Sequence, residues 1–473
     1  MRGIRIWAIA LVGLGLTLVA TNLSAQTTGT IYGQVSDSSG AAVPGANIQA
    51  LNTATTLSEK GISDALGTYR ISALPPGPYK ITVEHAGFET YVQSGITVVV
   101  NENARVDATL KIGAVTQVVS VTAAAQSVDT QSSVVGTTVD DLRVEAMPLN
   151  GRNLFWLTQL LPGVGMGASA TAVDSGFDTV TTTARSGATF NASGARGQQN
   201  NIQLDGTWMV EAMYNYGVDL PSPDAIQEFR ALTNTFNAEY GRSAGGIFLA
   251  VTKSGTNQFH GSLFEYGRNT ALNARNFFST TKPYLRQNQF GGNLGGPVRL
   301  PGYNGRDKTF FFFNYQAARI RQQSLITMFS PNAAERQGVF PSAITDPTTG
   351  KPFANNTIPA SRFDPMAKNI EALVPLPTLA NGENITLLPI PINDGEYTAK
   401  IDHEFSASSR LSFRFYRNKS EQGNLEGGNV LVQNGGIGST TYNLDQTVNL
   451  RYTTVFSPTL MNEAEFSQLR VDP

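Results

Sequence analysis

The sequence predicts a mainly β protein with three successive parts: an N-terminal β-sandwich, an α+β unit, and part of an antiparallel transmembrane β-barrel of about seven strands that does not close. Three observations support this fold class. Short apolar segments alternate with Gly- and Pro-rich turns over residues 29–112, helical and strand patterns are mixed over 131–253, and apolar and charged side chains alternate with a period of two within 254–473.

Composition narrows the functional classes. A chain of 473 residues is long enough for several domains of ~100–200 residues each. Its net charge of −2 gives no electrostatic reason to expect nucleic acid as a partner. Cysteine is absent, which excludes disulfides, thiol catalysis and cysteine-bound metals. Charged residues make up 15%, below the ~25% of average soluble domains, as suits an exported or outer-membrane β protein.

Residues 1–25 have the pattern of a signal peptide. Arg2 and Arg5 precede the apolar run "IWAIALVGLGLTLVA", and the small residues Ser24 and Ala25 form a cleavage site. This run is shorter than the ~20 residues of a membrane-spanning helix. If the mature protein lies in a membrane, it must therefore do so as a barrel, because only helices and closed barrels satisfy every backbone group there.

The segment 29–112 has the short strands and regular turns of a β-sandwich. Strand patterns such as "TIYGQV" and "YKITVE" are separated by turn clusters such as "DSSG" and "LPPGP". The ordered motifs "GQVSDSSGAAVPGANI", "SDALGTYRISALPPGPYKITVEHAGF" and "ITVVVNENARVDATL" resemble the carboxypeptidase regulatory-like domain. That resemblance implies a non-catalytic sandwich with a carbohydrate-binding-like fold.

Residues 113–130 form a linker rich in Ala, Val, Ser and Thr. Its strand-forming core can add to the sheet edge of another protein. It resembles the TonB box that outer-membrane receptors offer to the periplasmic energy-coupling protein, and the alternative is a last sandwich strand followed by a linker. The predicted box consists of Val118, Val119, Ser120, Val121, Thr122 and Ala123.

The segment 131–253 is predicted to mix helices and strands. "PLNGRNLFWLTQLLPGV" and the start of "SPDAIQEFRALTNTFNAEYG" have helix signals. "RGQQNNIQLDG" predicts a strand that ends in an Asp-Gly turn, and "GGIFLAVTKSG" predicts a closing strand. These segments, in this order, resemble the plug domain of TonB-dependent receptors.

Several polar residues of this segment are predicted to have a role in the plug. Arg196 and Asp205 are predicted to form a turn-stabilising pair, with ligand contact as the alternative. Glu239 and Arg242 are predicted to reach the barrel wall, where Glu265 and Arg268 offer partners for buried charges. The full predicted motif is Arg196, Asp205, Gly206, Glu228, Glu239, Tyr240, Gly241, Arg242, Gly245 and Gly246.

The loop 206–217 is rich in aromatic residues and methionine. It either lines a ligand cavity from below or packs within the plug. Its predicted ligand-facing residues are Trp208, Met209, Tyr214 and Tyr216.

The glycines of "EYGRSAGGIFLAVTKSG" do not form a phosphate-binding loop. Such a loop needs glycines after a strand and before a helix, whereas these glycines precede a strand and the Thr-Lys-Ser follows it. We expect them where the last plug strand runs close under the barrel wall, because glycine permits close backbone approach. The barrel then begins near residue 254.

Residues 254–473 have the pattern of the N-terminal part of an outer-membrane barrel. Strands are predicted at 257–269, 284–298, 308–327, 397–406, 410–418, 441–456 and 459–470, with Tyr397, Tyr416, Tyr442 and Tyr452 as an interfacial girdle. The long stretch 328–392 is predicted to be extracellular and resembles a loop of the Oar-like receptors. Because such barrels close with many more strands, we expect the chain to be a fragment or a truncated product.

The pattern and the resemblance together indicate a TonB-dependent outer-membrane receptor for energy-coupled uptake. Only three histidines occur, spread over the three parts, and no nucleophile motif accompanies them, so neither an enzyme nor a metal or cofactor site is predicted. Expected partners are a TonB-type periplasmic protein, outer-membrane lipid, and a siderophore, oligosaccharide or peptide substrate. The alternative is a secreted or surface carbohydrate-binding or adhesion protein that uses the sandwich.

Overall fold

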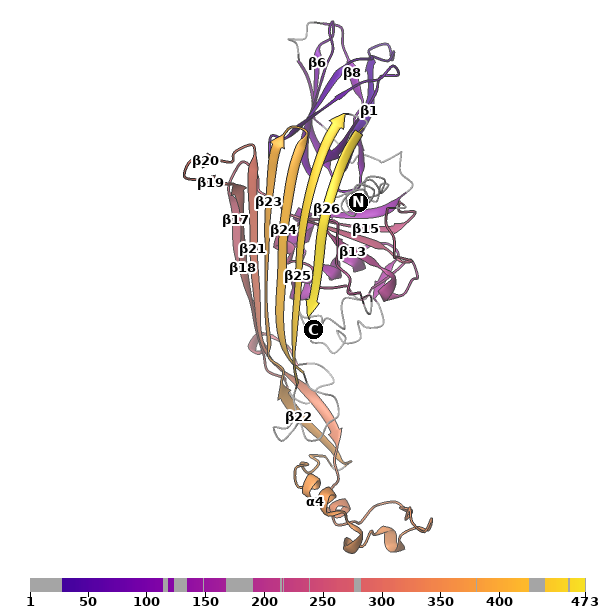
Figure 1. Cartoon of the computed structure of the whole chain (residues 1–473). Helices are drawn as coiled ribbons and strands as arrows, with labels where there is room; N and C mark the ends of the chain where they lie inside the picture. The colour runs from indigo at the N-terminus through magenta and orange to yellow at the C-terminus, as the bar shows by residue number, and fades with distance from the viewer. Residues whose placement is uncertain are drawn as a thin grey trace, which may run out of the picture.

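The computed structural model describes residues 28–113, 118–122, 134–147, 149–166, 190–212, 215, 217–237, 239–275, 282–379, 381–424, 439–457 and 460–472. The predicted signal peptide lies outside these residues. Figure 1 shows the sandwich at one end of a tall curved sheet, a smaller mixed unit against the concave face of that sheet, and a small loop region at the far end. The mainly β fold class predicted from the sequence is confirmed.

The sandwich consists of two sheets. One has the order β4-β1-β7, with β8 also paired to β1, and the other has the order β3-β2-β5-β6-β9. The strands are β1 (Gly29–Asp37), β2 (Asn47–Asn52), β3 (Ser58–Ile62), β4 (Thr68–Leu74), β5 (Gly77–Glu84), β6 (Thr90–Val98), β7 (Asn103–Arg105), β8 (Ala108–Leu110) and β9 (Val118–Thr122).

Alternation along these strands builds the sandwich core. On β2 and β5, every second side chain is buried and its neighbours are at least partly exposed, as expected for strands with one face against a core. Ile31, Ile48, Tyr79 and Ile81 are each at most 1% exposed. The two sheets therefore enclose one apolar core.

The middle unit, here called the plug, is built on a five-stranded sheet of order β10-β15-β16-β13-β14. Its strands are β10 (Val135–Asp140), β13 (Asn201–Leu204), β14 (Thr207–Trp208), β15 (Ile226–Asn234) and β16 (Ile247–Thr252), and β11 (Val164–Met166) pairs with β12 (Phe190–Ala192) beside it. Short helical turns complete it: α2 (Asp141–Ala146), η1 (Asn150–Arg152), η2 (Leu154–Leu160), η4 (Gly197–Gln199) and η5 (Pro223–Ala225).

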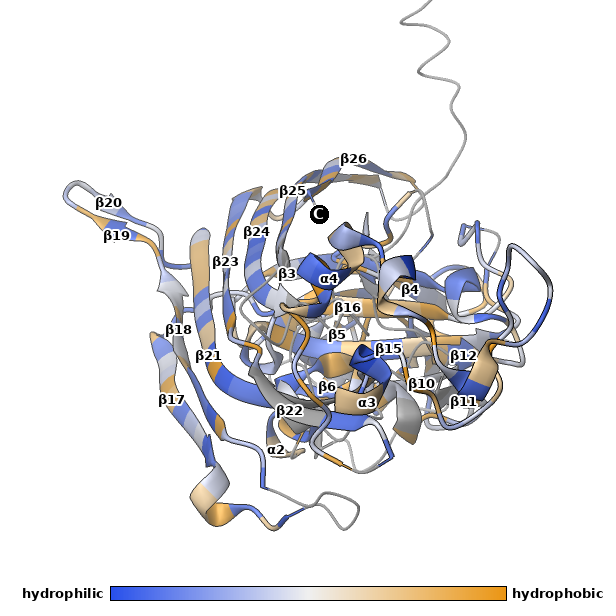
Figure 2. Cartoon of the chain, turned by 90° about the horizontal axis from the view of Figure 1, so that it is seen from below, coloured by the Kyte–Doolittle hydropathy of each residue, from blue (hydrophilic) through white to orange (hydrophobic). Residues whose placement is uncertain are grey.

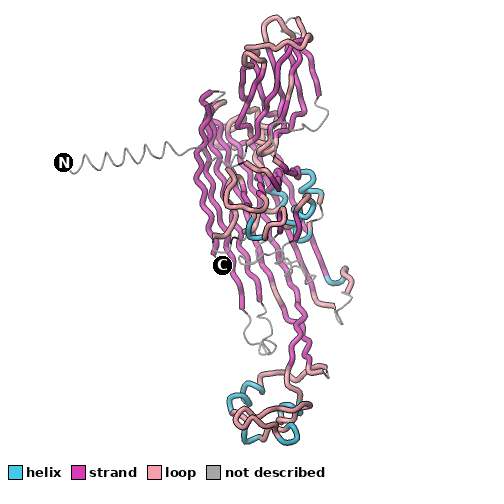
Figure 3. The backbone as a smooth tube through the Cα atoms, turned by 90° about the vertical axis from the view of Figure 1, so that its right-hand side faces the viewer, coloured by secondary structure: helices cyan, strands magenta, loops and turns pink. Residues whose placement is uncertain are grey.

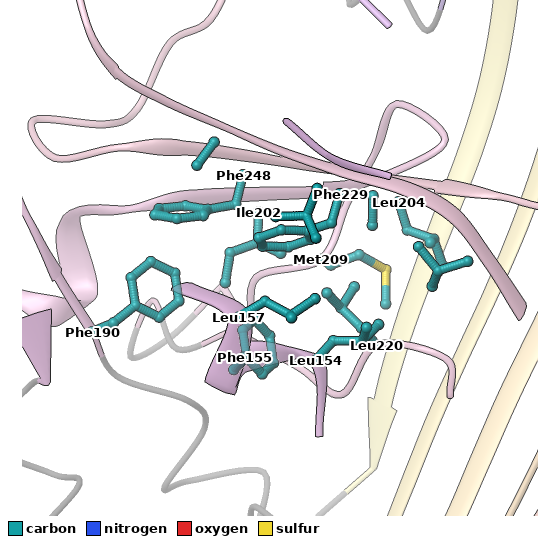
Figure 4. Packing of buried hydrophobic residues seen from close by; sticks show 14 of the residues in the cluster. Leu154, Phe155, Leu157, Phe190, Ile202, Leu204, Met209, Leu220, Phe229 and Phe248 are labelled. Atoms are coloured by element: carbon teal, nitrogen blue, oxygen red, sulfur yellow. The ribbon is translucent and has the colours of Figure 1, made fainter. Parts of the chain in front are cut away.

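The plug core lies between the sheet and the η2 turn (Figure 4). Leu154 and Leu157 are buried, whereas Leu160 is 55% exposed. A helix was predicted here, and the structure forms it as the 3₁₀ segment η2 rather than as an α-helix. Leu154 and Leu157 of this 3₁₀ segment pack in the same core as Phe229 and Phe248 of the sheet.

The helix predicted after Ser222 is wrong. Only the single turn η5 forms, and β15 follows immediately. Its residues from Glu228 to Leu232 are all buried, because β15 is covered on both faces and lies between β10 and β16 in the sheet. A strand that is buried on both faces lacks the two-residue alternation by which a strand is recognised in sequence.

The third part, here called the wall, is one antiparallel sheet of order β17-β18-β21-β23-β24-β25-β26, with β22 paired to the far end of β21. Its strands are β17 (His260–Asn269), β18 (Leu285–Pro297), β21 (Thr309–Phe329), β22 (Glu383–Pro389), β23 (Ile392–Ser406), β24 (Ser409–Asn424), β25 (Ser439–Ser457) and β26 (Leu460–Asp472). The short strands β19 (Arg299–Leu300) and β20 (Tyr303–Asn304) form a hairpin between β18 and β21, and η6 (Thr270–Leu272) follows β17.

The two faces of the wall differ in polarity, and Figure 2 shows hydrophilic and hydrophobic residues alternating along these strands. On β24, Arg414 and Asn418 are buried toward the plug, and Phe413 and Phe415 lie on the opposite face. An apolar outer face and a polar inner face are typical of membrane barrels. The seven predicted strands of the wall are confirmed.

One predicted girdle residue needs correction. Tyr416 was assigned to an interfacial girdle, but it is fully buried and packs with the plug core. Tyr416 and Arg414 are two residues apart on β24, so both side chains point to the inner face of the wall. In the run Phe310–Phe313, Phe310 and Phe312 are buried, whereas Phe313 is 45% exposed on the other face.

The long segment between β21 and β23 is partly strand and partly a small compact loop region. β21 and β22 pair along 323–329 and 383–389, and α3 (Ala333–Arg336), η7 (Ala354–Asn356), η8 (Ala360–Arg362) and α4 (Pro365–Glu371) follow within the loop. This region lies at the opposite end of the wall from the sandwich (Figure 3).

No helix in the described parts of the chain is long and apolar enough to cross a membrane.

Candidate functional site at the plug and wall interface

The tight turn between β13 and β14 inserts the plug into the inner face of the wall. Asp205 and Gly206 both have positive φ, 47° and 83°, as in the type I′ turns that join two antiparallel strands. A Cβ on Gly206 would collide with the side chains of Arg451 and Glu465. The turn conformation therefore favours glycine at this position, and an added Cβ would also force the ends of these two side chains to move.

Asp205 is the central carboxylate of this contact. Its Oδ2 lies 2.9 Å from Nε of Arg414, and its Oδ1 lies 3.9 Å from Nζ of Lys400. Within the plug, Thr252 donates to the same carboxylate from its backbone N–H at 2.9 Å and from its hydroxyl at 2.6 Å. One side chain thus joins two plug strands to two wall strands.

The wall also holds the backbone of this turn. Nη2 of Arg414 donates to the carbonyl of Leu204 at 3.1 Å, and Nη2 of Arg451 donates to the carbonyl of Asp205 at 2.7 Å. Asn449 donates from Nδ2 to the hydroxyl of Thr207 at 3.0 Å. The wall thus holds two backbone carbonyls of this turn and the hydroxyl of Thr207.

Burial and charge oppose each other at Asp205. Burial disfavours its ionised form, but the nearby Lys400 and Arg414 charges and the two hydrogen bonds from Thr252 outweigh it, so the pKa of Asp205 is lowered from its usual value of 3.8. Asp205 is therefore ionised at neutral pH. The Arg414 side chain is only 1% exposed, so both charges depend on each other for compensation.

A second contact joins the plug to the first strands of the wall. Arg152 forms a buried ion pair with Asp224 of the plug and donates to Gln316 of β21 at 3.0 Å. Its guanidinium also lies over the rings of Phe264 and Tyr266 on β17, at 4.5 and 4.6 Å. Arg152 was not singled out from the sequence, although the motif "PLNGRN" contains it.

The segment before η5 makes a third contact. The backbone N–H of Ser222 donates to Glu396 of β23 at 2.6 Å, and its hydroxyl accepts from Asn314 of β21 at 3.0 Å. Lys253 pairs with Glu145, and Ser254 bonds to Asp402, where the chain leaves the plug. The plug is therefore held by polar contacts to β21, β23, β24 and β25 and by the cation–π contacts to β17.

The predicted pairings of the plug motif differ from those observed. Asp205 pairs with the wall and not with Arg196, which instead precedes the η4 turn and donates from its backbone N–H to the side-chain oxygen of Gln199 at 3.1 Å. Arg242 was predicted to reach the wall, but its guanidinium lies 3.9 Å from the ring of Trp208 within the plug. Glu239 accepts from Asn237 at 3.4 Å, and burial raises its pKa.

The aromatic loop 206–217 is only partly described. Met209 is fully buried in the plug core, so it packs rather than facing a ligand. Trp208 is partly buried beside that core under Arg242. Tyr214 and Tyr216 lie outside the described residues.

Gly245 and Gly246 allow close packing within the plug and not, as was predicted, close approach to the barrel wall. A Cβ on Gly245 would meet Asn200, and one on Gly246 would meet Phe248 and Ala192, all within the plug. Gly255, just after the last plug strand, is the glycine of this stretch that lies against the wall, beside the backbone of Phe311 and Gly296. The close approach to the wall thus occurs at Gly255, after the last plug strand, and not at the paired glycines before that strand.

The predicted TonB box coincides with β9. This strand pairs in parallel with β6 of the sandwich, with Val118 opposite Thr90 and Thr122 opposite Ser94. β9 is the last strand in the order of its sheet. Ala123 lies outside the described residues, and the functional assignment of the segment stays a prediction.

The interface holds two parts of one chain together. Its groups are ion pairs and hydrogen bonds, and among the described residues no group of three or more His, Asp or Glu side chains is placed to hold a metal ion.

Comparison with known proteins agrees with this architecture. Residues 30–111 match the carboxypeptidase regulatory-like domain, and residues 251–472 match the family described as an outer membrane beta barrel domain. A TonB-dependent transporter, Oar of Myxococcus xanthus, is 27% identical over 309 residues, which are 63% of this chain and 27% of that protein. The chain thus spans about a quarter of the length of this curated relative.

Solved outer-membrane proteins align with part of this chain. A mutant of the ferric enterobactin receptor PfeA of Pseudomonas aeruginosa aligns with a TM-score of 0.44 at 12% identity, covering 72% of this chain and 42% of that one. The outer membrane transporter YddB of Escherichia coli aligns with a TM-score of 0.40 at 12% identity, covering 68% and 37%. The two family matches and the transporter of Myxococcus xanthus thus show that this chain is similar, part by part, to the carboxypeptidase regulatory-like domain, to the outer membrane beta barrel domain and to a TonB-dependent transporter.

Proposed function

We propose that the protein is a TonB-dependent receptor that takes up a substrate across the outer membrane, with the plug gating the barrel. The observation that carries this proposal is the Asp205 turn, which anchors the plug to the inner face of a wall whose outer face is apolar. Such an anchor closes a barrel, and it is reversible because it consists of ion pairs and hydrogen bonds.

In this mechanism the substrate binds at the end of the wall that carries the loop region 330–382, and the energy-coupling partner acts at the end that carries the sandwich. The partner adds a strand to the segment at Val118–Ala123. Pulling on that segment displaces the plug and opens a path along the wall. The reaction needs no bond chemistry, so no catalytic group is assigned.

The polar inner face supports this proposal over a carbohydrate-binding adhesin. An adhesin that used only the sandwich would not require a plug held by buried charges against a membrane wall. Substrates consistent with the architecture are an iron–siderophore complex, an oligosaccharide or a peptide.

Uptake by the full-length protein tests the proposal. A strain that lacks the gene is screened for growth on iron chelates as the sole iron source, on oligosaccharides as the sole carbon source and on peptides as the sole nitrogen source. Restoring the wild-type gene is the positive control. We expect one class to require the gene, and to lose uptake when residues 118–123 are replaced by prolines. A strand-forming replacement of the same length is the matched control, because strand addition depends mainly on backbone bonds. Release of the protein into the medium with unchanged growth would contradict the proposal.

A further inference from the structure

The turn at Val100 fastens the sandwich to the plug. Its backbone N–H donates to Oε1 of Glu228 at 2.7 Å, and its carbonyl accepts from Nη1 of Arg230 at 2.6 Å. Glu228 and Arg230 are alternate residues of β15, so they point to the same face of the plug sheet. Together they hold both polar groups of one peptide residue.

The side chain of Val100 adds an apolar contact. It is 1% exposed and belongs to a cluster with Leu232, Ile247, Leu249 and Val251 of the plug. This cluster lies on the opposite face of the plug sheet from the main plug core. Val100 is therefore inserted into the plug, and the sandwich covers a surface that would otherwise be apolar and exposed to water.

The sandwich also contacts the wall. The hydroxyl of Thr56 donates to Asp307 at 2.6 Å, and the backbone N–H of Asn257 donates to the carbonyl of Ala54 at 3.1 Å. Arg410 at the start of β24 donates to the carbonyl of Ala73. Figure 1 shows the sandwich at the end of the wall where β23 ends and β24 begins. The same domain thus spans the plug and the rim of the wall.

The placement of β9 connects this docking to the predicted box. β9 is paired with β6, and β6 ends at Val98, two residues before Val100. A pull on β9 therefore acts on the sandwich sheet through its pairing with β6, and through that sheet on the Val100 contact. The chain that follows leads to β10, which is itself paired with β15.

We propose that the sandwich is a latch on the plug: it must leave Glu228, Arg230 and the wall rim before the plug can move, and a pull on β9 releases it. The force-driven part rests on the proposed function, whereas the docking does not. The latch gives the N-terminal domain a mechanical role and makes plug release a two-step event.

The first experiment measures docking alone. The chain has no cysteine, so Gln227→Cys in the full-length protein reports access to the covered surface, where Gln227 now donates to the carbonyl of Pro76 at 3.2 Å. We expect Val100→Asp to raise the maleimide labelling rate at least tenfold and Val100→Ala to raise it less. Ile112→Asp, an exposed position on the sandwich, is the control and should leave the rate unchanged. Equal rates in all variants would overturn the docking.

The second experiment tests the latch. The pair Thr56→Cys and Asp307→Cys places two thiols at positions whose native side chains are hydrogen-bonded, and formation of the disulfide is checked first. The oxidised protein in membranes is pulled by a force probe through a biotinylated tag inserted after Gly113. We expect plug extraction to be lost when the pair is oxidised and to return on reduction, with each single cysteine behaving as wild type. Extraction at the same force in the oxidised and reduced forms would overturn the latch.

These readouts need no substrate, so they separate the two proposals. Unchanged growth of the deletion strain on every substrate class, together with an intact latch, would refute the transport proposal alone. Normal uptake by the oxidised double-cysteine protein would refute the latch alone.

Discussion

Asp205 carries the contact between plug and wall because one carboxylate compensates two buried cations. The sequence indicated that Asp205 mattered, from its place in an Asp-Gly turn between two strands. It did not reveal the partners, because Lys400 and Arg414 lie about two hundred residues further along the chain and are brought to Asp205 only by the pairing of β23 with β24. Arg152 was missed for the same reason.

Replacing Asp205 with Asn should loosen the turn strongly. The change leaves Arg414 buried without its counter-charge, which costs about 3–5 kcal/mol. Hydrogen exchange of the β13 and β14 amides in the full-length protein measures this, and protection should fall by at least a hundredfold. Asp472→Asn removes a carboxylate from an ion pair that is about half exposed and serves as the control. Equal protection in both variants would show that the pair does not hold the turn.

Acid should release the same turn. Because the pKa of Asp205 is lowered from 3.8 in the folded protein, its charge stabilises the docked turn above about pH 4, and this contribution disappears as the pH falls through the lower, folded-state pKa. Tryptophan fluorescence of Trp208, beside the turn, follows the release. Asp205→Asn should abolish the acid transition; an unchanged transition would assign it to another group.

The docking of the sandwich should respond to pH in the opposite direction. Burial raises the pKa of Glu228 to about 8, despite the hydrogen bond from Val100, with Arg230, Glu102 and Asp141 as its charged neighbours. Undocking returns Glu228 toward its usual value of 4.5, so docking is strongest below that pH and weakens as the pH rises through about 8. The labelling rate of Gln227→Cys, relative to exposed Leu66→Cys, should therefore rise from pH 6 to pH 9, and Glu228→Gln should remove the rise.

At the scale of elements, strands with one polar and one apolar face were predictable and strands with two buried faces were not. The wall strands alternate clearly because the lumen side is polar and the lipid side apolar. β15 has buried residues on both faces, so its N-terminal Ser-Pro signal was interpreted as a helix. The type of helix at η2 was likewise not predictable, because leucines spaced three or four residues apart fit both a 3₁₀ helix and an α-helix.

The plug core should be sensitive to cavities. Met209 is fully buried among core residues, and Met209→Ala should lower the stability of the plug by about 2–5 kcal/mol. Urea unfolding of the full-length protein, followed by Trp208 fluorescence, measures the loss. If Met209 faced a ligand cavity instead, the midpoint would stay unchanged.

At the scale of the whole molecule, the order of the three parts was predictable from the sequence, but their contacts were not. The Val100 latch joins residues more than a hundred positions apart, and Val100 itself has no motif. The same holds for β9, whose sequence allowed either a free box or a last sandwich strand. The structure places it in the sandwich sheet, and the two interpretations are compatible if the strand is offered at the edge of that sheet.

The most direct test of the central claim is cysteine cross-linking in cells between positions 118–122 of the full-length protein and the strand-forming segment of the periplasmic energy-coupling protein. The absence of native cysteines makes each cross-link assignable. We predict disulfides at successive positions of β9, stronger when substrate is present and absent when the segment is replaced by prolines. If the protein is in the outer membrane and none of these positions cross-links under any condition, it is not coupled through β9 and the account is wrong.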